Sequence, residues 1–222
     1  VKNVLFSSRP RQTLKEIVFR RISISQISPY KTEGPAIATF YGRNKELRKI
    51  LGSHRRSFTI LGARKIGKSS LLRRLDKELN EMGAFVFYMD LESPSNPDYN
   101  SFLQRMEGEI NRVFNDDIRF QNDIDRFTAE IKKLPKGNKK LVFIMDEIDE
   151  LLLYDREHDF RLVKSLRSLF HEGYCQFVFS GFEVLQNVKR DIQSPLYNFS
   201  EEILLGPLEE TFARDLIKEP MG

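Results

Sequence analysis

One eight-residue segment constrains the fold of this chain more than any other feature. Residues 62–69 read Gly-Ala-Arg-Lys-Ile-Gly-Lys-Ser, which fits the pattern G-x-x-x-x-G-K-[ST]. The apolar stretch Ser57–Leu61 precedes the segment, and Lys68–Met82, with leucines at helical spacing, follows it. A strand that passes through a glycine-containing turn into a helix is typical of a parallel sheet with helical crossovers. The segment therefore predicts an α/β fold.

The chemistry of this turn predicts a site for the phosphates of a nucleotide. Glycines let backbone N–H groups point inward around an anion, and the following helix directs its positive end to the same place. Lys68 is expected to reach the β- and γ-phosphates and to act in catalysis, and the Ser69 hydroxyl to bind Mg²⁺. The predicted nucleotide-binding residues of this loop are Gly62, Ala63, Arg64, Lys65, Ile66, Gly67, Lys68, Ser69 and Ser70.

A pair of acids after a second strand supplies the other half of the expected site. Leu141–Met145 is a continuous apolar run, as in a strand covered on both faces, and Asp146 and Glu147 follow it. Asp146 is predicted to hold Mg²⁺, and Glu147 to orient and polarise the water that attacks the γ-phosphate. The next acids, Asp149 and Glu150, are expected only to begin the following helix.

Two further observations concern the nucleotide and its hydrolysis. Ser180 ends a strand-like run, where its hydroxyl is placed to contact the γ-phosphate or the attacking water; the alternative is an ordinary serine at a strand end. A GTPase would carry Asp-x-x-Gly after the Mg²⁺-binding strand and Asn-Lys-x-Asp late in the chain. Here Asn138–Leu141 precedes that strand. We therefore predict ATP and ADP as ligands, and ATP hydrolysis as the activity.

Strand-like and helix-like segments alternate along the rest of the chain, which supports a parallel sheet. The expected strands are Ser57–Leu61, Ala84–Met89, Leu141–Met145, Gln176–Phe179 and Ile203–Leu205. The expected helices are Arg43–Leu51, Lys68–Met82, Tyr99–Phe114, Phe120–Leu134, Glu150–Tyr154, Phe160–Phe170 and Glu183–Arg190. Before them we expect one short regular piece at Thr13–Ile24 and a linker rich in proline and glycine at residues 28–35.

Basic residues are concentrated in the first third of the chain. Residues 1–74 contain 18 lysines and arginines against 3 acids, and residues 75–222 contain 18 against 29. Such an excess of positive charge predicts an anionic partner, which is a nucleotide, a nucleic acid or an acidic protein face. The alternative is that the acidic remainder of the chain neutralises this charge in the fold.

The composition also indicates where the protein works. A single cysteine, Cys175, allows no internal disulfide, and no apolar run approaches 18 residues. We therefore predict a cytoplasmic protein with no membrane partner. Because the chain begins at Val1 without an initiator methionine, we interpret it as a piece of a longer protein whose other domains are partners.

Together these motifs resemble those of the prokaryotic STAND-type ATPases, an AAA-related class that includes archaeal ATPases and initiator-like proteins. Phe40–Leu47, in which an aromatic residue precedes Gly-Arg and Glu-Leu follows, resembles the motif that opens the family's ATPase domain. In the family this motif lies beside the nucleotide, which implies nucleotide binding by Tyr41, Gly42 and Arg43. The segment around Pro207 resembles the one that closes over the base, which implies the same for this proline.

The resemblance covers residues 28–220 and implies a P-loop NTPase fold. This is a three-layer αβα sandwich with strand order 5-1-4-3-2 and Ser57–Leu61 at the centre of the sheet. It also implies a basic N-terminal extension and linker over residues 1–39 and an ATPase domain over residues 40–222, without the helical lid and winged-helix domain that follow in the family. The chain departs from the family after Ser180, where Gly181 and Phe182 stand in place of a common arginine.

Three hypotheses for the function follow. In the first, the domain is a nucleotide-dependent switch in a larger signalling or defence-type protein, reset by slow hydrolysis and able to form a homo-oligomer. In the second, it is a nucleic-acid-binding AAA-type ATPase of the initiator or transposition-helper kind, and DNA binds its basic N-terminal half. In the third, it is a scaffold that binds nucleotide without hydrolysing it, which the pair Asp146 and Glu147 disfavours.

Overall fold

A computed structural model describes residues 40–53, 55–92, 97–135 and 137–218 of the chain. The expected extension over residues 1–39, with its regular piece at Thr13–Ile24, lies outside these residues. Within them the chain forms a five-stranded sheet in which every neighbouring pair of strands is parallel. The strands are β1 (Ser57–Leu61), β2 (Phe85–Asp90), β3 (Leu141–Asp146), β4 (Gln176–Gly181) and β5 (Ser200–Leu204).

The strand order is β2-β3-β4-β1-β5, which confirms the predicted order 5-1-4-3-2 counted from the other edge. β1 is an interior strand that is hydrogen-bonded to β4 on one side and to β5 on the other. The middle position nevertheless belongs to β4, because three strands lie on one side of β1 and only β5 on the other. The expectation that β1 is central is therefore wrong by one place.

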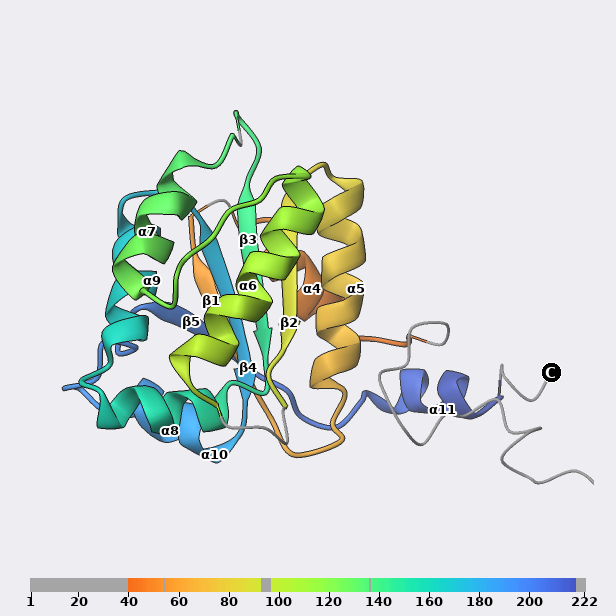
Figure 1. The fold of residues 1–222 in the computed structure, drawn as a ribbon. Helices are drawn as coiled ribbons and strands as arrows, with labels where there is room; N and C mark the ends of the chain where they lie inside the picture. Colours follow the sequence, from red (N-terminus) through yellow and green to blue (C-terminus); the bar gives the residue numbers. More distant parts are fainter. Residues whose placement is uncertain (1–39, 54, 93–96, 136, 219–222) are drawn as a thin grey trace, which may run out of the picture.

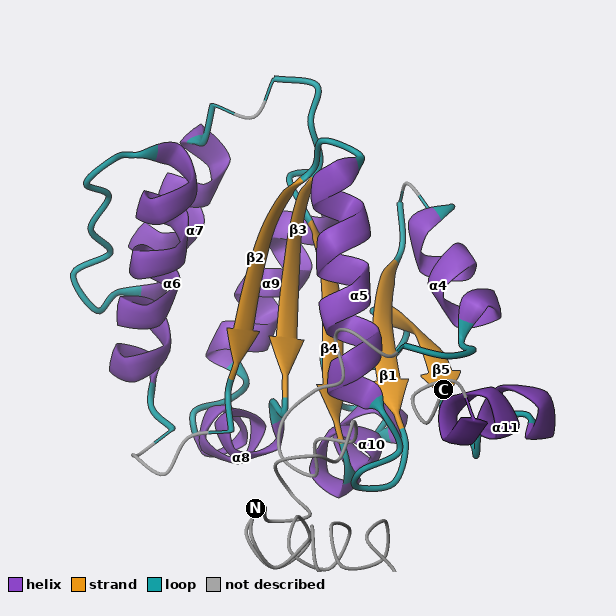
Figure 2. Cartoon of the chain, turned by 90° about the vertical axis from the view of Figure 1, so that its right-hand side faces the viewer, coloured by secondary structure: helices purple, strands orange, loops and turns teal. Residues whose placement is uncertain are grey.

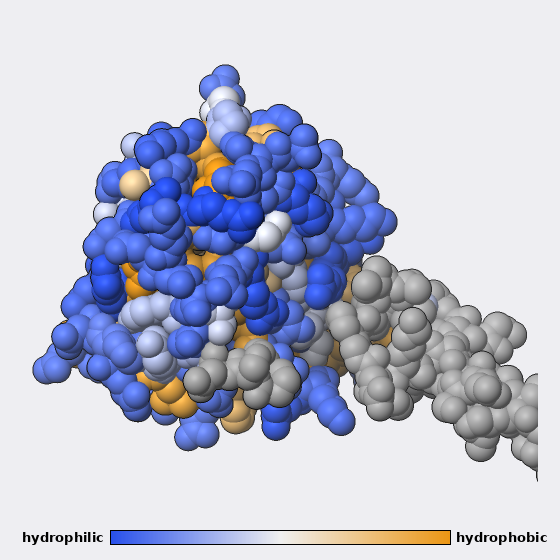
Figure 3. Space-filling model, in the orientation of Figure 1, coloured by the Kyte–Doolittle hydropathy of each residue, from blue (hydrophilic) through white to orange (hydrophobic). Residues whose placement is uncertain are grey.

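Helices cover both faces of the sheet and make the predicted three layers (Figures 1 and 2). One face packs against α4 (Asn44–Leu51) and α5 (Lys68–Glu81). The other face of the sheet packs against the remaining core helices. The molecular surface seen in Figure 3 is mostly hydrophilic, because the polar sides of the helices point outward. The remaining core helices are α6 (Tyr99–Phe114), α7 (Ile124–Lys133), α8 (Asp149–Glu157), α9 (Arg161–His171) and α10 (Glu183–Arg190), and α11 (Glu210–Lys218) follows β5.

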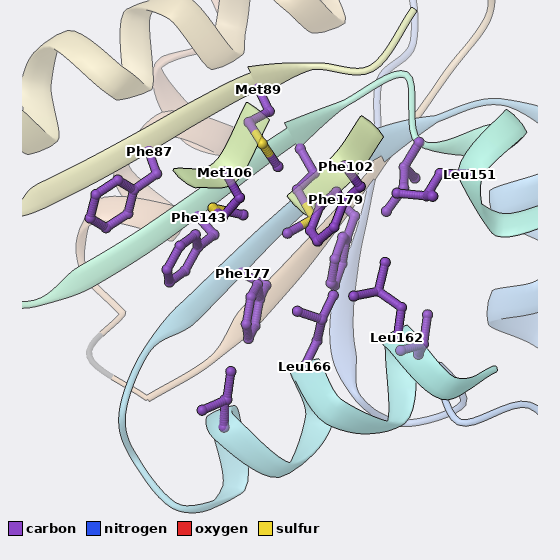
Figure 4. Packing of buried hydrophobic residues seen from close by; sticks show 14 of the residues in the cluster. Phe87, Met89, Phe102, Met106, Phe143, Leu151, Leu162, Leu166, Phe177 and Phe179 are labelled. Atoms are coloured by element: carbon purple, nitrogen blue, oxygen red, sulfur yellow. The ribbon is translucent and has the colours of Figure 1, made fainter. Parts of the chain in front are cut away.

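The strands read as continuous apolar runs because both of their faces are buried. Successive side chains of a strand point to opposite faces, so Phe143 faces the core on the α6 and α9 side and Ile144 faces α5. Phe87, Phe143 and Phe177 lie in register on three neighbouring strands, with ring centroids 4.8 and 5.5 Å apart. Figure 4 shows these rings side by side on one face of the sheet.

The structure confirms the order and type of the predicted elements and moves several of their ends. The predicted helix at Phe120–Leu134 begins only at Ile124, because the Asp123 carboxylate accepts hydrogen bonds from the next N–H groups and starts the helix there. The predicted helix at Glu150–Tyr154 is longer, Asp149–Glu157.

The last two elements differ most from the prediction. β5 covers Ser200–Leu204 rather than Ile203–Leu205, because Glu201 and Glu202 belong to it although carboxylates are unfavourable inside a sheet. As an edge strand it tolerates them, and Glu201 pairs with Lys49 and Arg56, with an N–O separation of 2.6 Å in each pair. Helix α11 was not among the predicted elements.

Because all five strands are parallel, their carboxyl ends lie at one edge of the sheet, where the loops after β1, β3 and β4 meet (Figure 2). α8 and α10 lie at this edge as well.

None of the helices in the part of the chain that the structure describes has both the length and the apolar character that crossing a bilayer requires.

A buried carboxylate fixes the start of α9. Asp155 is fully buried, and its oxygens accept hydrogen bonds from the N–H groups of Leu162 and Val163, at 2.8 and 3.0 Å, and from the Tyr99 hydroxyl. It therefore satisfies donors that the first turn of a helix leaves unpaired.

We expect Asp155→Ala to lower the free energy of unfolding by about 3 kcal/mol, because it removes a cap worth about 1 kcal/mol and leaves buried donors unpaired. Asp98→Ala is the matched control, since Asp98 caps α6 through a single backbone N–H at 2.8 Å and should cost only about 1 kcal/mol. Urea denaturation measures both. Equal losses for the two variants would contradict the structural role given to Asp155.

Candidate nucleotide-binding site

The turn between β1 and α5 has the shape that an anion-binding loop requires. Gly67 has φ 97°, a left-handed conformation that favours glycine, and Lys65 has φ 61°. The Ile66 N–H donates to the Ala63 carbonyl at 3.3 Å, which closes the turn. α5 begins at Lys68, directly after Gly67, which has no side chain to cap the helix, and the amino end of α5 is directed at the loop.

Lys68 joins the two predicted halves of the site. It is the first residue of α5, and its side chain is only 3% exposed. Its ammonium donates to the Gly62 carbonyl at 3.3 Å and lies 3.4 Å from Oε1 of Glu147. Residues that are 79 positions apart in the sequence therefore meet as an ion pair at the carboxyl edge of the sheet. Ser69 and Ser70 are the next two residues of α5, and both are half-buried.

Asp146 is the last residue of β3 and is 1% exposed. Its Oδ2 accepts a hydrogen bond from the Tyr88 hydroxyl at 2.9 Å, and its Oδ1 accepts one from the Glu147 N–H at 3.1 Å. Burial and the nearby Asp146 carboxylate raise the pKa of Tyr88, so its hydroxyl remains a donor.

The donor set suits a hard cation that is shared with phosphates. Asp146 and Ser69 offer a carboxylate and a hydroxyl oxygen, and Mg²⁺ usually binds one or two such protein oxygens together with nucleotide phosphates and water. Among the described residues, no three His, Cys, Asp or Glu side chains come together as a metal site. One buried carboxylate together with one hydroxyl fits Mg²⁺ that is bound with a nucleotide.

Glu147 differs from Asp146 in backbone, exposure and charge. Its φ of 50° is unusual for a residue other than glycine, and such conformations cost of the order of 1–3 kcal/mol. Its side chain is 31% exposed, which leaves it open toward the loop. Partial burial raises the pKa of Glu147, and the neighbouring Lys68 ammonium offsets part of that rise.

Ser180 lies on β4 beside these groups. It is fully buried, and its hydroxyl is the one buried side-chain oxygen or nitrogen without a hydrogen-bond partner in the described part of the chain. Alternation along the strands places Ser180 and Asp146 on the α5 face, since Val178 and Ile144, two residues earlier, lie in register in the core on that face. An unpaired buried hydroxyl is costly, so its presence at this edge needs a reason.

Asp149 begins α8, as predicted, and has a second role that was not predicted. Its carboxylate caps α10. It accepts hydrogen bonds from the N–H groups of Phe182, Val184 and Leu185 at 2.8, 2.9 and 3.1 Å. The side chain therefore fastens the loop after β4 to the loop after β3.

This cap explains why a glycine follows Ser180. A Cβ atom at Gly181 would lie 2.2 Å from Oδ2 of Asp149 and 3.0 Å from two side-chain carbons of Leu185. Any larger side chain at this position, an arginine included, would collide with this cap. The departure at Gly181 is thus a consequence of the packing of α10.

Arg43 ties three segments together at the edge of the loop. Its side chain is 8% exposed, and its guanidinium donates to the carbonyls of Gly206 and Ile66 and lies 3.6 Å from the Glu46 carboxylate. The segment before α4, the phosphate loop and the segment after β5 are therefore held by one side chain.

The other residues that the resemblance implicated lie around this contact. Gly42 is buried, and a Cβ atom there would lie 3.1 Å from the Phe212 ring of α11, so α11 packs against this motif. Tyr41 is half-buried beside it, and Pro207 is exposed, directly after the carbonyl that Arg43 binds. The structure thus places Tyr41, Gly42, Arg43 and Pro207 close together in the fold, and their contact with a nucleotide stays a prediction.

Sequence reasoning missed Tyr88 and the cap formed by Asp149. Tyr88 stands two residues before the end of β2, and the period of two would have placed it on the face that Asp146 occupies. Asp149 carried no such signal, because α10 begins 34 residues further along the chain.

The parallel sheet with this order and a glycine-rich loop after β1 define a fold of the P-loop NTPase type. Residues 40–218 match the family described as the ATPase domain predominantly from Archaea, and the chain belongs to this family. Its predicted STAND-type membership stays a prediction. No curated protein matches the chain significantly.

Solved structures share the fold at low sequence identity. The ORC1 protein of Aeropyrum pernix, in complex with DNA, is 19% identical over 82% of this chain and 50% of its own, with a TM-score of 0.57. A Walker-type ATPase of Pyrococcus abyssi is 20% identical over 85% and 60%, also with a TM-score of 0.57. Cdc6p of Pyrobaculum aerophilum is 16% identical over 90% and 53%, with a TM-score of 0.53. The chain therefore spans about half to three fifths of the length of these proteins.

We expect Gly181→Ala to destabilise the fold by about 1–3 kcal/mol, because the new methyl group overlaps the Asp149 carboxylate. In an Asp149→Ala background the same substitution should cost less, because the closest obstructing atom is gone. A double-mutant cycle from urea denaturation measures this difference, for which we expect at least about 0.5 kcal/mol. Strictly additive losses would show that the cap does not impose the glycine.

Proposed function

We propose that this domain binds ATP together with Mg²⁺ and hydrolyses it, with Glu147 as the general base. The observation that carries the proposal is the contact of Lys68 with Glu147 at 3.4 Å. It brings the phosphate-binding loop and the acid after β3 to one place, as in-line attack by water on a γ-phosphate requires.

Each side chain then has a distinct task. Lys68 and the N–H groups of the loop bind the phosphates, and Lys68 exchanges its partner Glu147 for phosphate oxygens. Glu147, released from the ammonium, orients the water and accepts its proton, for which a raised pKa is suitable. The buried hydroxyl of Ser180 donates its hydrogen bond to the γ-phosphate or to this water.

Ser69 and Asp146 would hold the Mg²⁺ ion of the nucleotide. When bound, the ion neutralises charge that develops on the phosphates. The contribution of the chain is to keep the Asp146 carboxylate buried and oriented at the end of β3.

Two substitutions test this assignment in different ways. Lys68→Ala should weaken ATP binding roughly 10–100-fold, because charge-assisted hydrogen bonds to phosphate are worth about 1.5–3 kcal/mol. Glu147→Gln should keep ATP affinity near the wild-type value and lower the turnover rate by roughly 10²–10⁴-fold. Fluorescent-nucleotide titration and phosphate release measure the two effects.

Glu81→Gln is the matched control for Glu147→Gln. Glu81 is the last residue of α5, at the end of the helix opposite the phosphate loop, and its exposed side chain pairs with Lys77 at 3.8 Å, so turnover should stay unchanged. Normal ATP affinity in Lys68→Ala would refute the binding site. Normal turnover in Glu147→Gln would refute the role of Glu147 as the base.

For the cellular role, we propose an initiator-type ATPase that associates with DNA, in preference to a signalling switch. The ORC1 protein of A. pernix, which has the same fold, was solved in complex with DNA. The specific observation in this chain is a basic hollow of about 590 Å³ at the amino ends of β3 and β4, away from the phosphate loop.

The hollow combines several cations with one carboxylate that is already paired. Arg55, Lys139 and Lys140 line it, and its acid, Glu172, is paired with Lys132. Burial lowers the pKa of Lys140, because the ammonium loses hydration that an anion would replace. The described residues as a whole hold 28 lysines and arginines against 29 acids, so the positive charge of the hollow is a local feature.

The double variant Arg55→Glu with Lys139→Glu should weaken the binding of duplex DNA. The slope of log K against the logarithm of the salt concentration should fall in magnitude by about 2, because each lost phosphate contact lowers this slope by about 0.9. The control, Lys77→Glu with Arg112→Glu, makes the same charge change on the exposed surfaces of α5 and α6. Electrophoretic mobility shifts over a salt series measure both. An equal slope in both variants would exclude the hollow as a DNA site, and hydrolysis that ignores DNA would favour the switch.

A further inference from the structure

We propose that Tyr88 is a positioning residue for the Mg²⁺-binding carboxylate of Asp146, and that its hydroxyl sets how strongly Mg²⁺ enhances ATP binding. The inference rests on the proposed function, because it assigns Asp146 to the metal. It adds a residue from β2, a strand that contributes nothing else to the predicted site.

The sheet register brings the two side chains together. Tyr88 is paired with Ile144, and Asp90 with Asp146, so Tyr88 lies one strand away and two residues back from the carboxylate. Its Oη donates to Oδ2 of Asp146 at 2.9 Å, while the Glu147 N–H donates to Oδ1 at 3.1 Å. Each carboxylate oxygen therefore has one donor, and together the two donors fix the plane of the group.

The Tyr88 ring is itself held by the helix that carries Ser69. The guanidinium carbon of Arg73, on α5, lies 3.6 Å from the centroid of the Tyr88 ring, within the range of a cation–π contact. Arg73 stands four residues after Ser69, one turn further along the same helix. A chain of two side chains thus connects the helix that bears the hydroxyl ligand to the strand that bears the carboxylate ligand.

The hydrogen-bond partners of a metal ligand affect how strongly that ligand binds the metal. A carboxylate that is already oriented loses less rotational freedom when it binds a cation or the cation's water. Without the tyrosine hydroxyl, Oδ2 of Asp146 would be a buried oxygen with no donor, and the carboxylate would be free to rotate. We therefore expect Tyr88 to affect the Mg²⁺-dependent part of ATP affinity and not the part supplied by Lys68.

The test compares Tyr88→Phe with Tyr99→Phe. The first keeps the ring and its contact with Arg73 and removes only the hydroxyl. The second removes a hydroxyl that donates to another buried aspartate, Asp155, at the start of α9. ATP affinity is measured by isothermal titration in EDTA and over a series of Mg²⁺ concentrations, and binding of Mn²⁺ in the presence of ADP is followed by electron paramagnetic resonance.

In Tyr88→Phe we expect ATP affinity in EDTA to match wild type, and the Mg²⁺ and Mn²⁺ concentrations for half-maximal effect to rise roughly tenfold. Tyr99→Phe should match wild type in both. Arg73→Gln, which removes the contact on the ring and keeps the hydroxyl, should shift the metal dependence in the same direction but less.

Three results would overturn the inference. An unchanged metal dependence in Tyr88→Phe would show that the hydroxyl does not position Asp146. A loss of affinity in EDTA as large as the loss in Mg²⁺ would show a structural role only. If the wild-type protein binds ATP with no gain from Mg²⁺, the proposed function itself fails, whatever the variants do.

Discussion

The organisation of the site depends on one buried positive charge. The Lys68 side chain is almost fully enclosed, and burying an ammonium is costly unless it is paired and hydrogen-bonded. The chain meets this requirement with the Gly62 carbonyl from the loop after β1 and with the Glu147 carboxylate from the end of β3. These groups share one edge only because the strands are parallel. The sheet order, the glycine turn and the acid pair therefore satisfy a single electrostatic constraint.

The acids that follow β3 show how the surroundings give similar groups different tasks. Asp146 is buried and held by two donors, which suits a fixed ligand. Glu147 is partly exposed, sits on a left-handed backbone and has a raised pKa, which suits a group that exchanges partners and protons. Asp149 accepts three backbone hydrogen bonds as a cap on α10, which suits a structural role. In the proposed function, three carboxylates within four positions thus serve a metal, a reaction and the fold.

Most of the fold could be predicted because its strongest signals are local. The apolar runs and the leucine spacing of α5 indicate the type of each element directly, and the family resemblance correctly gave the strand order.

The sequence pattern was not informative where the partner of a residue is distant in the sequence. The charged residues of β5 look unlike a strand until β1 and the cations around Glu201 are beside them. The capping role of Asp149, and with it the need for Gly181, depends on a helix that only the tertiary structure brings close. In the candidate site the motif residues were predictable, whereas Tyr88 needed the pairing of β2 with β3.

The contacts of the Arg43 guanidinium link the affinity of the phosphate loop for nucleotide to the packing of α11. It binds the Ile66 carbonyl in the phosphate loop and the Gly206 carbonyl in the segment that leads to α11, and α11 in turn packs on Gly42. The same guanidinium N–H groups of Arg43 therefore contact both the phosphate loop and the segment that positions α11. Since such coupling is reciprocal, whatever free energy nucleotide contributes to the docking of α11, the docking of α11 contributes equally to nucleotide affinity.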